Sequence, residues 1–164
     1  MKRGRSGNAV LEVALWMPVL LLLISGAIQF GKLTYLDYVL NKIVYNAARN
    51  VATAQNLNLC DPADLTLTNA ITAAINDPAT GQPLIANLTS DMLVVTTRCA
   101  DSTGALAICV PSCQGVQVPQ QRPDYVTVAI ADPGYSVQLR IPYINPIPVS
   151  LHPSATAPFA GSAL

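Results

Sequence analysis

The stretch AVLEVALWMPVLLLLISGAIQF, residues 9–30, decides how this chain is organised. As an α-helix, these 22 residues would span about 33 Å, enough to cross the roughly 30 Å hydrocarbon core of a bilayer. The chain is 51% hydrophobic and only 11% charged, whereas about 25% charged residues is usual in soluble domains. We therefore expect a membrane-spanning helix near the N-terminus.

Basic residues precede this helix and set its orientation. Lys2, Arg3 and Arg5 lie in the first seven residues, so the positive-inside rule places residues 1–7 in the cytoplasm and the chain beyond Lys32 outside. A cleaved secretory signal is the alternative, but the apolar core of such signals is only about 7–15 residues long. We expect a single-pass protein of the inner (plasma) membrane, with a cytoplasmic N-terminus and a periplasmic or extracellular C-terminal domain.

Glu12 is an acid within this apolar run. A carboxylate costs on the order of 2.5–3.5 kcal/mol at the bilayer centre and less near its surface. One interpretation is that Glu12 lies shallow enough to reach headgroups and water. The other comes from its spacing: a basic leader, then Gly7, then four residues, then the acid.

This spacing resembles a type IV prepilin processing site. The resemblance implies that a prepilin peptidase cuts between Gly7 and Asn8, which leaves Glu12 at the fifth position of the mature chain. Cleavage would remove three positive charges and create one α-amino group. If helices pack side by side with a small stagger, that amine can neutralise Glu12 of a neighbour in a medium of low dielectric constant. Glu12 would then specify the partner and the register.

Two further segments carry a family resemblance. The runs Phe30-Gly31-Lys32-Leu33-Thr34-Tyr35 and Asn46-Ala47-Ala48-Arg49 resemble the helix landmarks of TadE-like proteins, the pilin-like minor subunits of tight-adherence (Flp-type) pilus systems. The likeness runs from Arg3 to about Ala54. Val13 departs from the pattern, since an aromatic residue commonly follows the acid in that family.

The resemblance is looser at the C-terminal segments Tyr125–Val128 and Ile141–Pro148, and it does not cover residues 57–120. It implies a minor pseudopilin that a prepilin peptidase processes and that acts with other minor pilins and the pilus assembly machinery, in the filament or at its base. It implies no catalysis.

The predicted organisation has three parts: a cleaved leader (residues 1–7), a transmembrane and amphipathic helix (residues 8–56) and an ectodomain with a proline-rich tail (residues 57–164). The helix should continue to about Gln55, because apolar residues recur there every three or four positions. This apolar stripe comprises Leu36, Leu40, Ile43, Val44, Ala47 and Val51. It could face this protein's own strands, as we favour, or another subunit.

Twelve of the thirteen prolines follow residue 61, which indicates turns and short strands in the ectodomain. A second helix of about 12 residues should start around Asp61-Pro62-Ala63-Asp64, with the proline in its first turn. The alternating patterns predict strands at Met92–Arg98, Ala105–Val110, Tyr125–Ala131 and Tyr135–Ile141. Asp132-Pro133-Gly134 should form the hairpin turn between the last two. The fold class is therefore α+β with a small antiparallel sheet, and residues 142–158 should be extended as an edge or a surface wrap.

All four cysteines lie in the ectodomain: Cys60, Cys99, Cys109 and Cys113. An even number outside the membrane favours two disulfides, with three possible pairings. A zinc site is the alternative. Cys109 and Cys113 lack the Cys-x2-Cys spacing of zinc ribbons, and His152 is the only histidine.

The sequence also argues against other function classes. Residues 61–164 hold seven aspartates against three arginines, a charge balance that gives no support to nucleic-acid binding. Catalytic, metal and cofactor motifs are missing, so we expect no enzyme, no metal and no cofactor, and we regard His152 as an exposed tail residue. The alternative function is a single-pass, membrane-anchored binding domain that never joins a filament.

Overall fold

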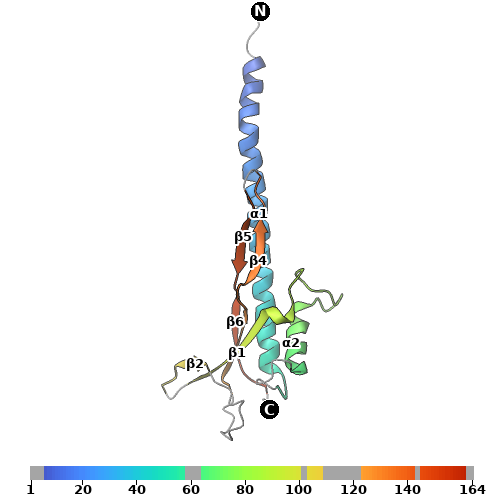
Figure 1. Cartoon of the computed structure of the whole chain (residues 1–164), viewed down its shortest axis with the longest axis vertical. Helices are drawn as coiled ribbons and strands as arrows, with labels where there is room; N and C mark the ends of the chain where they lie inside the picture. Colours follow the sequence, from blue (N-terminus) through green and yellow to red (C-terminus); the bar gives the residue numbers. More distant parts are fainter. Residues whose placement is uncertain (1–5, 58–63, 101–102, 109–122, 143–144, 162–164) are drawn as a thin grey trace, which may run out of the picture. The chain divides into compact units, whose positions relative to one another are not determined.

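The computed structural model describes residues 6–57, 64–100, 103–108, 123–142 and 145–161, with side chains from Val10 onward. Its contacts divide the chain into two compact units. Unit 1 comprises Met1–Tyr35 and Ser136–Val149, and unit 2 comprises Leu36–Tyr135 and Ser150–Leu164. The elements, most of which are labelled in Figure 1, are α1 (Ser6–Thr53), α2 (Leu65–Ile75), the 3-10 turn η1 (Ser90–Met92), β1 (Leu93–Ala100), β2 (Leu106–Ile108), β3 (Tyr125–Ile130), β4 (Tyr135–Leu139), β5 (Ile147–Leu151) and β6 (Ser154–Pro158).

Unit 1 combines the N-terminal part of α1 with the two-stranded sheet β4–β5. The predicted long helix is confirmed, and Pro18 lies inside it. Proline cannot donate an N–H to the carbonyl four residues before it, so that carbonyl loses its helical partner. Along β4, Tyr135, Val137 and Leu139 are partly covered, whereas Ser136 and Gln138 are exposed. This two-residue period shows that one face of the hairpin is covered.

Unit 2 is built around the C-terminal part of α1. Leu40 and Ile43 are fully buried there, and Val44 is 1% exposed. They share one hydrophobic core with Val126 and Val128 of β3, so the apolar stripe packs against this protein's own strands, as favoured from the sequence. Burying one such side chain contributes on the order of 1.5–3 kcal/mol. This packing holds the helix to the sheet.

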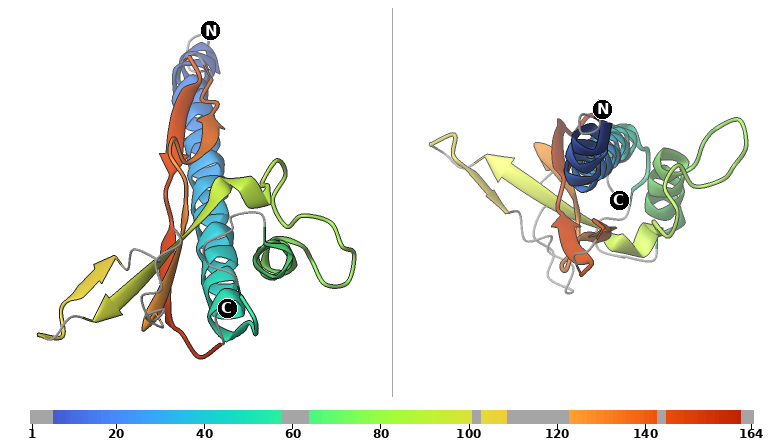
Figure 2. Two further views of the ribbon diagram at one scale, coloured as in Figure 1. Left: turned by 60° about the horizontal axis from the view of Figure 1, so that its bottom comes forward. Right: turned by 90° about the horizontal axis from the view of Figure 1, so that it is seen from above.

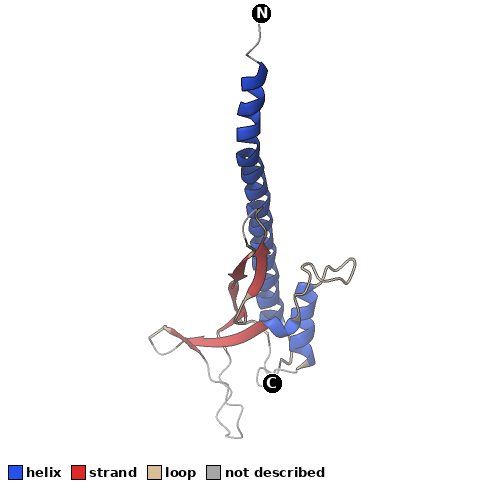
Figure 3. Cartoon of the chain, turned by 45° about the horizontal axis from the view of Figure 1, so that its top comes forward, coloured by secondary structure: helices blue, strands red, loops and turns tan. Residues whose placement is uncertain are grey.

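The sheet of unit 2 has the strand order β2-β1-β3-β6 among the described residues, and every pair is antiparallel. The strands and helices are distinguished by colour in Figure 3. β6 comes from the proline-rich tail and lies at one edge of the sheet, which confirms that this segment is extended and not central. The α+β class is confirmed, although the strands form two sheets.

The second helix begins later than predicted. Its N-cap is Asp64, whose carboxylate Oδ1 accepts hydrogen bonds from the N–H groups of Thr66 (2.6 Å) and Leu67 (3.0 Å). The expectation that Pro62 lies in the first turn was therefore wrong, because the Asp64 cap fixes the start at Leu65. On its inner side α2 buries Leu67 and Ile71. Its Ala70 carbonyl accepts a 3.2 Å hydrogen bond from the Asn50 side chain of α1, and Figure 2 shows the two helices side by side.

The expected hairpin between β3 and β4 was also wrong. Residues 132–134 do form a turn, in which Gly134 has a φ of +86° and donates its N–H to Ala131 (2.8 Å). However, β1 and β6 already occupy both edges of β3, and β4 pairs with β5 instead. The turn therefore leads out of one sheet and into another. Tyr135, which follows it, donates its hydroxyl to the Ala86 carbonyl at 2.8 Å, and burial raises the pKa of this hydroxyl.

The C-terminal segment closes the end of α1. The N–H groups of Ala160 and Gly161 both donate to the Ala52 carbonyl at 2.8 Å, one of the carbonyls that the last turn of a helix leaves without an intrahelical partner. Phe159 is buried next to them in the core. A Cβ on Gly161 would overlap the Ala54 carbonyl oxygen. Only glycine allows this close approach.

We therefore predict that Gly161→Ala lowers the free energy of unfolding by about 1–3 kcal/mol, the usual cost of overpacking. Thermal unfolding of the full chain in detergent would measure the loss. Gly31→Ala is the matched control, because a Cβ there meets no atom within 4 Å and alanine favours the helix. Equal melting temperatures for the two variants would show that the close contact at Gly161 is unimportant.

Candidate functional site

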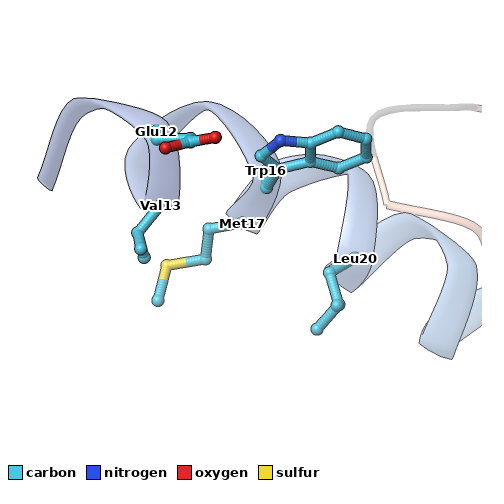
Figure 4. Close-up of a pocket in the computed structure, with 5 residues that line it drawn as sticks. All are labelled: Glu12, Val13, Trp16, Met17 and Leu20. Carbon is cyan, nitrogen blue, oxygen red and sulfur yellow. The ribbon is translucent and has the colours of Figure 1, made fainter. Parts of the chain in front are cut away.

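The candidate site lies on the N-terminal part of α1, where an acid interrupts an apolar surface. Glu12 lines a shallow open pocket together with Val13, Trp16, Met17 and Leu20 (Figure 4). All five residues come from two turns of one helix, because positions three and four apart share a helical face. In Figure 4 the carboxylate of Glu12 and the indole of Trp16 lie on the same side of the helix.

The charge of Glu12 is not balanced within the part of the chain that the structure describes. Among the described residues, no cation lies within ion-pair distance of its carboxylate. The neighbouring apolar side chains are open, with Trp16 66% and Met17 57% exposed. If lipid surrounds these side chains, the charge must come close to water or to a cation on another molecule, since an unpaired carboxylate is costly in hydrocarbon. A site that lacks a counter-charge of its own can select a partner that brings one.

The wider helix surface is apolar and uncovered. The candidate membrane span begins at Val10, its most apolar window has a mean hydropathy of 2.1, and none of that window is buried. Leu15 (74% exposed) and Leu23 (69%) are typical of it. Soluble monomers rarely present so large a continuous apolar surface to water. By length and composition, α1 is suited to act as a single-pass membrane anchor.

Only some of the other predicted site residues lie in the described part of the chain. Gly7 and Asn8 lie in the first turns of α1, and cleavage between them stays a prediction. Cys99 on β1 is buried and is not a free thiol, whereas Cys60, Cys109 and Cys113 fall outside the described residues. The disulfide pairing therefore also stays a prediction. Among the described residues, no group of three or more His, Cys, Asp or Glu side chains could hold a metal ion.

The comparison with protein families now bears directly on this helix. The family model for TadE-like proteins matches residues 7–49. Residues 7–49 form a TadE-like domain. This domain begins at the predicted cleavage site and includes the whole pocket around Glu12. TadE-like proteins are a pilin-related structural family, and the helix is the part of the chain that is similar to them.

The remainder of the chain has no counterpart of this kind. Neither a curated protein nor a solved structure matches any part of the chain, residues 7–49 included. The TadE-like domain ends within α1, before the described sheets begin. What the ectodomain contacts must therefore be argued from its own residues.

One contact was missed from the sequence. His152, expected to be an exposed tail residue, is indeed 45% exposed, but its Nε2 lies 3.4 Å from Oδ1 of Asp132. Gly134 lies against the same imidazole ring, since a Cβ there would touch it. The nineteen residues between Asp132 and His152 contain no pattern that indicates this contact, because it depends on how the chain returns through β4 and β5.

Proposed function

We propose that this chain is a minor, pilin-like structural subunit for the assembly of tight-adherence pili. The TadE-like domain supports this proposal most strongly, because it coincides with an apolar helix surface that the acid Glu12 interrupts. In this account a prepilin peptidase removes residues 1–7, and α1 holds the mature protein in the inner membrane. Other minor pilins and the assembly machinery are its partners, and its activity is assembly and not catalysis.

The proposed role of Glu12 follows from the cost of charges in lipid. After cleavage at Gly7–Asn8, the mature chain has one α-amino group close to one carboxylate. A charge left unpaired in a medium of low dielectric constant costs several kcal/mol. The amine of one subunit and Glu12 of its neighbour each remove the other's penalty when their helices pack with a short stagger. The Glu12 pocket, which has no cation of its own among the described residues, is suited to that pairing.

The orientation of the proposed subunit follows from its charges. The leader stays in the cytoplasm because it carries the basic residues Lys2, Arg3 and Arg5. The prepilin peptidase would reach the Gly7–Asn8 bond from that side. The ectodomain then lies on the periplasmic or extracellular side. In that oxidising compartment its four cysteines would form two disulfides, in line with the absence of a free thiol at Cys99.

A second candidate is a membrane-anchored binding domain that recognises a ligand outside the cell and never joins a filament. It is favoured by the short extent of the TadE-like domain and by the separate core of unit 2. In that case α1 would be an anchor only, and the identity of the residue at position 12 would matter little.

The two candidates predict different results for Glu12→Gln. We expect this variant to insert in the membrane at least as well as the native chain, because it removes an intramembrane charge. Its co-purification with neighbouring pilins should fall by about a hundredfold or more, since loss of one partner of a desolvated charge pair costs about 3–5 kcal/mol. Quantitative pull-down from solubilised membranes measures both quantities.

Asp37→Asn is the matched control: it makes the same chemical change on the same helix, at an exposed position beyond the apolar run. It should leave co-purification unchanged. If Glu12→Gln assembles as well as Asp37→Asn, then Glu12 has no part in assembly and the anchored binding domain becomes the better account.

The cysteines give a further prediction. The protein is purified from its native membrane, denatured and alkylated with N-ethylmaleimide. Alkylation should add no mass before reduction and four adducts after reduction. Treatment with a zinc chelator should change neither result. Four adducts without reduction, or adducts that appear only after chelation, would replace the disulfides by free thiols or a zinc site.

A further inference from the structure

One side of α1 in unit 1 is partly covered, and the cover begins at a definite point. Ser25, Gly26, Gln29 and Leu33 are all partly buried, whereas the described residues before Ser25 are exposed. Their spacing places them on one side of the helix, and Ser25 Oγ is completely shielded there. Most of β4 and β5 belongs to the same compact unit and runs beside this part of α1 (Figures 1 and 2). The hairpin therefore covers the helix from Ser25 onward.

The uncovered part of α1 is too short to cross a bilayer. From Val10 to Ile24 it has 15 residues, which span about 22 Å at 1.5 Å per residue. A hydrocarbon core is about 30 Å thick. Even from Asn8, the predicted start of the mature chain, the length reaches only about 25 Å. A bilayer that α1 crosses must therefore extend past Ser25 to the end of the hairpin.

The residues at the end of the hairpin are suited to contact with the bilayer. Backbone N–H groups without partners are costly in lipid, and three of the residues there, Pro142, Pro146 and Pro148, have no N–H. All three are exposed. Between them lies Ile147, an apolar side chain that is 47% exposed although it belongs to a strand.

The charges at this end point to the lipid headgroups. Arg140 is exposed immediately after β4, and the long stem of arginine can lie along apolar groups while its guanidinium reaches a phosphate. No acidic residue follows Asp132 in the chain. Nothing on this segment therefore repels an anionic lipid surface.

We propose that the end of the β4–β5 hairpin, residues 140–142 and 146–148, docks into the lipid headgroup layer on the outer face of the membrane that α1 spans. The inference rests on the proposed function only in requiring that α1 cross a bilayer. The hairpin would be a second attachment, beside the helix, that fixes how deep α1 lies and how it is rotated about its axis. A single helix alone fixes neither.

The rotation has a consequence for assembly. At 100° per residue, the centre of the five-residue Glu12 pocket points roughly 160° away from the face that the hairpin covers. When the hairpin docks in lipid, the Glu12 pocket is left open to a neighbouring helix in the plane of the membrane.

Tryptophan fluorescence can test this, because Trp16 is the only tryptophan in the chain. The full chain is reconstituted in phosphatidylcholine–phosphatidylglycerol vesicles whose acyl chains carry bromine close to the headgroup. In a Trp16→Phe background, Ile147→Trp and, independently, Pro146→Trp place a probe at the end of the hairpin. Ser136→Trp is the matched control: it is exposed on β4 but lies roughly 13 Å back along the strand from Arg140.

We expect the brominated lipids to quench the probes at 146 and 147 severalfold more strongly than the probe at 136. Equal, weak quenching at all three positions, with native Trp16 strongly quenched by a second set of lipids brominated deep in their acyl chains, would overturn the docked hairpin and leave the membrane helix intact. If the deeply brominated lipids also leave native Trp16 unquenched, α1 does not lie in lipid, and the inference falls together with the proposed membrane subunit.

Discussion

A single carboxylate on an otherwise apolar helix surface is the constraint on which this molecule depends. Glu12 lies among exposed apolar side chains with no cation in reach among the described residues. Removing this charge would make the helix a better membrane anchor, so anchoring alone does not explain the acid. In the proposed subunit it serves assembly, because the amine that cleavage exposes on a neighbouring chain can neutralise it.

The same helix also organises the ectodomain. Its C-terminal part carries the apolar stripe that unit 2 encloses, and the C-terminal segment of the chain closes its last turn through Ala160 and Gly161. Its N-terminal part is left bare except where the β4–β5 hairpin covers it from Ser25 onward. In the proposed subunit, one continuous helix therefore meets lipid along one part and a protein core along the other, and its sequence changes accordingly from uniformly apolar to amphipathic.

Features with a strong local cause could be predicted from the sequence. The apolar length of residues 9–30 and the three- and four-residue spacing after Leu36 fixed the nature of α1, and the excess of proline after residue 61 indicated strands and turns. Pairing partners could not be predicted, because they depend on distant segments. The turn at 132–134 shows this: its residues indicate a turn correctly, but only the occupied edges of β3 explain why β4 pairs with β5. The His152–Asp132 contact was missed for the same reason. The spacing of Gly7 and Glu12 lies within one helix and could be read from the sequence, and its role in cleavage and pairing stays a prediction.

The most direct measurement of the central claim is the mass of the mature N-terminal peptide, taken from native membranes of cells with an active prepilin peptidase. The account predicts a chain that begins at Asn8, with a free α-amino group that can pair with Glu12 of a neighbour. A protein that retains Met1 to Gly7 and still assembles would contradict it, because the amine that neutralises the acid would never have been made.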